Sequence, residues 1–112
     1  MLTPQERQQI RAEIGQVNNA IDQIRGEIDQ VRDRLDTCYQ ELRQLRVAQR
    51  SHERLASKPY MKHVGYQGGM VDSRMTMVES EIYNLKARKD QLFQRKNELH
   101  ARKSELYACL GK

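Results

Sequence analysis

Three basic doublets recur every seven residues in the second half of the chain: Arg88-Lys89, Arg95-Lys96 and Arg102-Lys103. Cationic groups at this density can bind the phosphates of a nucleic acid, or they can pair with carboxylates on a neighbouring helix. The chain has few aromatic residues on which bases could stack, which disfavours nucleic acid as a partner. We therefore expect these cations to form ion pairs within a helical structure.

An aspartate series with the same seven-residue interval lies in the first half of the chain. Each aspartate is predicted to pair with the lysine of one doublet: Asp36 with Lys89, Asp29 with Lys96, and Asp22 with Lys103. The two residue numbers have the same sum in all three pairs, as they must if two helices run antiparallel. Because ion pairs beside a helical seam fix its register, the charged residues predict a chain that turns near Lys62 and His63.

No set of residues has the spacing of a catalytic or metal site. His52, His63 and His100 are scattered, and Cys38 and Cys109 form no CxxC pair. A narrow helical structure also lacks the concave pocket in which a pKa is shifted for acid or base catalysis. We predict a protein that is not an enzyme and binds neither cofactor nor metal, with both cysteines as small core residues.

Apolar residues follow the heptad pattern of helices that pack along a seam. In the first half they alternate in steps of four and three: Ile10, Ile14, Val17, Ile21, Ile24, Ile28, Val31, Leu35, Cys38, Leu42 and Leu45. In the second half an apolar residue recurs every seven positions: Val78, Leu85, Leu92, Leu99 and Leu106. The lysines of the doublets occupy the alternate seam position of this half. The pattern predicts two long helices.

Local signals place the ends of these helices. Thr3 can cap a helix that begins at Pro4, because proline lacks the N–H that has no partner in the first turn. Pro59 and the glycines after it interrupt the heptad pattern, and Gly111 is a typical helix stop.

We predict helix one at about 4–57, a turn at about 58–69 and helix two at about 70–110. The predicted fold is an all-α, two-helix antiparallel coiled-coil hairpin with a Pro/Gly-rich turn, which forms one domain over residues 1–112. Its composition agrees with this fold, because 38% of the residues are hydrophobic and 31% are charged, as in long helices.

The sequence also bears on localisation. No apolar run approaches the roughly 20 residues of a membrane span, and residues 1–11 are polar where a signal peptide has its apolar core. We expect a cytoplasmic protein without a membrane span, and leave open its export alongside a partner. The net charge is +5, and the excess lies in the second half.

Two apolar surfaces exceed what a two-helix hairpin can bury. The first lies on helix two: Leu85, Leu92, Phe93, Leu99, Leu106 and Tyr107. The second is a Met-rich tip at the turn, with partner-binding residues at Met61, Met70 and Met75. A further helix, from another protein or another copy of the chain, is expected to cover them.

The predicted turn contains Tyr66-Gln67-Gly68, an aromatic-x-Gly motif between two antiparallel helices. This arrangement resembles the WXG superfamily of small type VII secretion proteins, and the chain length is similar to that of the helical-hairpin partners of LXG toxins. The resemblance implies packing against an LXG-type effector domain or another small hairpin protein, with Tyr66 and Gly68 in place of the family's Trp and Gly. The family's export motif, Tyr-x-x-x-Asp/Glu, is absent after Tyr83 and Tyr107. Its absence implies a cytosolic targeting role or reliance on the partner's signal.

These observations lead to one main hypothesis and two alternatives. The main hypothesis is a protein–protein interaction module that acts as a targeting factor or chaperone for a type VII, LXG-type secretion effector. The alternatives are a nucleic-acid-binding coiled coil that uses the basic doublets, and a structural coiled coil assembled from copies of the chain.

Overall fold

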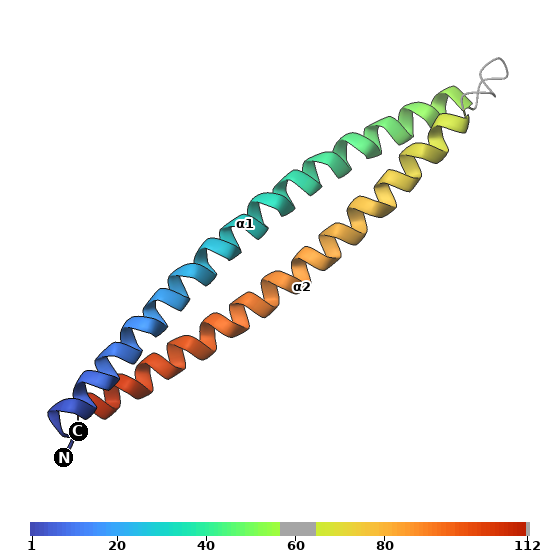
Figure 1. Cartoon of the computed structure of the whole chain (residues 1–112). Helices are drawn as coiled ribbons and strands as arrows, with labels where there is room; N and C mark the ends of the chain where they lie inside the picture. Colours follow the sequence, from blue (N-terminus) through green and yellow to red (C-terminus); the bar gives the residue numbers. More distant parts are fainter. Residues whose placement is uncertain (57–64, 112) are drawn as a thin grey trace. The chain divides into compact units, whose positions relative to one another are not determined.

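The computed structural model describes residues 1–56 and 65–111, with the backbone alone at 52, 55, 56 and 65–68. Two helices lie side by side in Figure 1, α1 (Pro4–Ala56) and α2 (Gly65–Leu110), and the described residues form no strand. The molecule is an all-α helical hairpin, as the heptad pattern predicts.

The start of α1 follows the predicted capping pattern. The backbone N–H of Glu6 donates to Oγ1 of Thr3 over 3.1 Å, and the N–H of Arg7 donates to the carbonyl oxygen of Thr3 over 3.0 Å. Pro4 is the first helical residue. The side chain of Thr3 therefore satisfies one N–H group that has no partner inside the helix, and its carbonyl oxygen accepts the first helical bond.

The helix α2 begins at Gly65, earlier than the predicted residue 70. Tyr66 and Gly68 therefore lie in the first turns of a helix and not in a tight turn. No described glycine has a positive φ, so these glycines follow helical backbone. Glycine weakens a helix by about 1 kcal/mol relative to alanine but does not end it, which explains the error.

Other predicted features at this end lie outside the described residues: Met61, Lys62, His63 and the rest of 57–64. At its other end α2 stops at Leu110, where the N–H of Gly111 donates to the carbonyl oxygen of Tyr107 over 3.0 Å. The end of α2 at Leu110 agrees with the predicted bound, but Gly111 lacks the positive φ of a glycine cap.

The chain divides into two compact units, each made of a segment of α1 and a segment of α2. Unit 1 comprises Met1–Val31 with Arg88–Lys112, and unit 2 comprises Arg32–Ala87. The core of unit 1 is a cluster of buried aliphatic residues: Ile14, Val17, Ile21, Ile24, Ile28, Leu92, Leu99 and Leu106. The core of unit 2 has the same character: Leu35, Cys38, Leu42, Val78 and Ile82.

The predicted seam is confirmed in both units. Every predicted seam residue of α1 is buried except Ile10, Val31 and Leu45, which are half-buried. On α2 the heptad leucines and Val78 are buried, with Leu85 half-buried, while Ile82 is an additional buried residue. The heptad pattern is therefore the main determinant of which faces meet.

Ion pairs between the helices show that the segments run antiparallel in each unit. Unit 1 has two such pairs: Arg102 with Glu13 (2.8 Å) and Arg88 with Glu27 (3.9 Å). Unit 2 also has two: Arg34 with Glu81 (2.6 Å) and Arg74 with Glu41 (2.6 Å). In each unit the residue number on α2 falls as that on α1 rises.

Candidate protein-binding surface

The arginines of the basic doublets bind carboxylates of the chain itself. Arg102 contacts Glu13 of α1 and also Glu105 of its own helix, at 3.2 Å. Arg95 lies 3.3 Å from Glu98. Arg88 pairs with Glu27, so all three arginines of the doublets contact a carboxylate of the chain.

The lysines of the doublets have a different environment. Lys89, Lys96 and Lys103 are half-buried at the seam of α2, and no described carboxylate lies within ion-pair distance of any of them. The ammonium of Lys96 lies 5.4 Å from the ring centroid of Phe93, and that of Lys103 lies 6.0 Å from that of Tyr107. Ring faces attract these cations in place of acids.

The three predicted Asp–Lys pairs do not form. Asp22 is exposed and lies 3.8 Å from Arg25 of the same helix, and Asp29 and Asp36 are exposed as well. Each aspartate directly follows a seam residue and so points roughly 130° away from the middle of the seam, at 100° per residue. Glu13 and Glu27 precede a seam residue and lie only about 70° away, which lets them reach α2.

The predicted partner-binding leucines have mixed positions. Leu92, Leu99 and Leu106 are buried in the unit 1 core, where α1 already covers them. Phe93 is half-buried against the same core, and Tyr107 is 53% exposed. Of the predicted α2 surface in unit 1, Tyr107 and the edge of Phe93 are therefore open to a partner.

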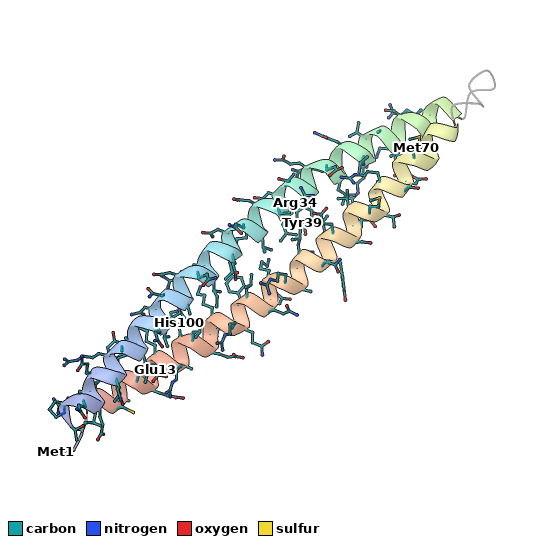
Figure 2. The ribbon with its side chains drawn as sticks, viewed as in Figure 1. Met1, Glu13, Arg34, Tyr39, Met70 and His100 are labelled. Atoms are coloured by element: carbon teal, nitrogen blue, oxygen red, sulfur yellow. The ribbon has the colours of Figure 1, made fainter. Side chains whose placement is uncertain are left out.

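Unit 2 presents more exposed apolar surface than the sequence suggests. Met70, Met77 and Tyr83 of α2 are 65%, 61% and 75% exposed, while Leu85 and Met75 are half-buried. Tyr83 was not predicted as a binding residue, although its position directly after the seam residue Ile82 indicates an outward side chain. Figure 2 labels Met70 near the start of α2. The side chains of Tyr66 and Gln67 are outside the described set.

The two cysteines differ in a way that the sequence did not indicate. Cys38 is fully buried in unit 2, and burial raises the pKa of its thiol. Cys109 is exposed, so the prediction of two core cysteines is wrong for this residue. Both thiols are free.

The short ion pairs of unit 2 perturb the groups that form them. The side-chain hydrogen bond from Arg34 lowers the pKa of Glu81, and hydrogen bonds to Glu81 and Glu41 raise the pKa values of Arg34 and Arg74. These shifts have a structural cause, since each follows from a pair that joins α1 to α2.

The described residues contain no group of three or more His, Cys, Asp or Glu side chains that could hold a metal ion. A shallow depression on α2 is lined by residues of that helix alone: Thr76, Glu79, Ser80, Tyr83 and Asn84. Neither α1 nor α2, as described, is apolar enough over a sufficient length to cross a membrane.

Comparison with known proteins identifies no relative. No protein-family model, no curated protein and no solved structure matches the chain. The surface of α2 is therefore the basis on which a function can be argued.

Proposed function

We propose that this chain is a non-enzymatic protein that binds a helical partner along α2. The observation that carries the proposal is the distribution of exposed apolar side chains. Of the large hydrophobic residues that are exposed among the described residues, four lie on α2: Met70, Met77, Tyr83 and Tyr107. On α1 the corresponding residue is Val47.

Side chains of these types favour a protein partner. Methionine adapts to irregular apolar surfaces, and tyrosine gives a large contact area with one polar end. Met70 and Met77 lie one heptad apart on the same face of α2 in unit 2, so a partner helix that lies along this face could contact both. The hairpin fold and chain length, which resemble those of the hairpin partners of LXG toxins, support a narrower version in which the chain targets or chaperones a type VII secretion effector.

The test is co-purification of the tagged chain from its host, with the mass of the native complex determined by light scattering. A defined complex with a larger helical protein is expected, and its identification as a secretion effector would support the narrower version. Tyr83→Glu and Met77→Glu should abolish the complex without reducing helicity. A chain that elutes alone or only as a homo-oligomer would contradict the proposal.

A matched control is available on the other helix. Gln40 is exposed on α1 and belongs to unit 2, like Tyr83. Gln40→Glu introduces the same negative charge and should leave the complex intact. Equal loss of the complex in Gln40→Glu and Tyr83→Glu would show that charge, and not the surface of α2, determines binding.

A further inference from the structure

In the described part of unit 1, the arginine residues of α2 form ion pairs with glutamates, whereas the lysine residues at the seam do not. Four glutamates of unit 1 pair with arginines: Glu13 and Glu105 with Arg102, Glu27 with Arg88, and Glu98 with Arg95. The guanidinium group binds a carboxylate with two or more N–H groups, so it competes well against an ammonium group for these acids. Among the described residues, no carboxylate lies within ion-pair distance of Lys89, Lys96 or Lys103.

The three lysines form a regular line along one side of the α2 seam. They are one heptad apart, which corresponds to a spacing of roughly 10 Å along the helix. Each is half-buried, because its aliphatic stem lies at the seam. Tyr107, which is exposed, lies beside Lys103 on the same side. Unit 1 therefore presents a row of cations next to an aromatic ring.

From this arrangement we propose that the partner of α2 is an acidic amphipathic helix. Its apolar residues would cover Tyr107 and the edge of Phe93, and its carboxylates, one per heptad, would pair with Lys89, Lys96 and Lys103. This inference rests on the proposed function, because it specifies the chemistry of the helix that binds α2. Charge complementarity at a regular spacing selects such a partner over neutral or basic helices.

A second copy of the chain fits this surface less well. Its own acidic line is Asp22, Asp29 and Asp36 on α1, where Asp22 already pairs with Arg25. The neighbouring residues on that face, Gly15 and Asn18 among them, are polar or lack a side chain. A second copy would thus supply acids but no apolar cover for Tyr107.

The test uses two synthetic helical peptides of three heptads, each with the same leucine stripe. One carries a glutamate in each heptad beside the stripe, and the other carries glutamine at the same positions. We expect the full chain to bind the glutamate peptide roughly tenfold more tightly at low salt, because three exposed ion pairs each contribute modestly. The preference should shrink as salt is raised.

Variants of the chain test whether the three lysines cause the preference for the glutamate peptide. The triple change Lys89→Gln, Lys96→Gln and Lys103→Gln should bind both peptides equally, while Lys86→Gln, a control in unit 2, should keep the preference. Equal binding of both peptides by the unchanged chain would overturn the acidic partner but leave helix binding intact. Binding of neither peptide would contradict both proposals, and a stable dimer by light scattering that excludes them would assign the surface to a second copy.

Discussion

Units 1 and 2 share one heptad pattern but fill it differently. In unit 2 the seam positions of α2 are occupied by Val78 and Ile82, and Cys38 and Val78 are the most completely buried large side chains of the described structure. In unit 1 half-buried lysines alternate with the buried leucines of α2. A lysine at a seam position lowers the stability of a helix pair. The comparison shows that α2 contributes apolar seam residues in unit 2, whereas in unit 1 its buried leucines alternate with charged side chains.

The largest effect is expected from the unit 2 core. Leu42→Ala removes most of a buried side chain and should lower the free energy of unfolding by about 2–5 kcal/mol. Lys96→Ala in unit 1 should change it far less. Thermal or urea unfolding followed by circular dichroism measures both. A loss of similar size in the two variants would show that the seam lysine stabilises the hairpin as much as a core leucine does.

The cysteines report the same difference through their reactivity. Cys109 of unit 1 is exposed, whereas Cys38 of unit 2 is buried and its thiol has a raised pKa. A chromogenic thiol reagent should modify Cys109 at least roughly 100-fold faster, since Cys38 must wait for the helices to open. The Cys38→Ser and Cys109→Ser variants show which cysteine gives the fast phase of modification and which gives the slow phase. Equal rates of modification for Cys38 and Cys109 would mean that opening of unit 2 does not limit the reaction of Cys38.

A smaller effect is expected when a seam lysine is made apolar. Lys96→Leu should raise the free energy of unfolding by about 1 kcal/mol, because an apolar side chain replaces a charged one at a half-buried seam position. Gln94→Leu, at an exposed position of the same helix, is the control and should have little effect. Destabilisation by Lys96→Leu would show that the lysine has a structural role in the hairpin.

The smallest effect concerns the ion pairs of unit 2. The pKa of Glu81 is lowered by its hydrogen bond from Arg34, so its contribution to stability is complete above the ordinary glutamate pKa of about 4.3. That contribution is lost as the pH falls through the lower value of the folded state. Glu81→Gln should remove this part of the acid dependence of the melting temperature. Glu79→Gln, an exposed control on α2, should not.

The fold could be predicted because its determinants are local and periodic. Seam residues such as Ile14, Ile21 and Ile28 recur at the helical heptad spacing, so their burial follows from the period alone. The cap at Thr3 and the stop at Gly111 depend only on neighbouring residues. The start of α2 was less certain from sequence, because glycine permits a turn without requiring one.

The ion pairs were harder to predict because the charges at successive heptad positions of α1 alternate in sign. At the α1 positions that reach α2, Glu27, Arg34 and Glu41 follow one another, and their partners carry the opposite charges. The aspartate series, in contrast, carries one charge at every heptad and is therefore easily noticed in the sequence. It has the heptad period of the seam, but this period alone does not show whether the aspartates face α2 or point away from it. The exposure of Cys109 and Tyr83 was missed for the same reason.

The sequence separation of the pairs between α1 and α2 has a consequence for how the chain folds. In unit 2, Gln49 bonds to Asp72 across 23 residues, and the two short ion pairs span 33 and 47. In unit 1 the pair of Arg102 with Glu13 spans 89 residues. Closing a shorter loop costs less chain entropy, so contacts nearest the turn are expected to form first and those of the chain ends last. During synthesis, the lysine-bearing segment of α2 would then emerge before its own α1 partner has been secured, and it would be available to another helix at that time.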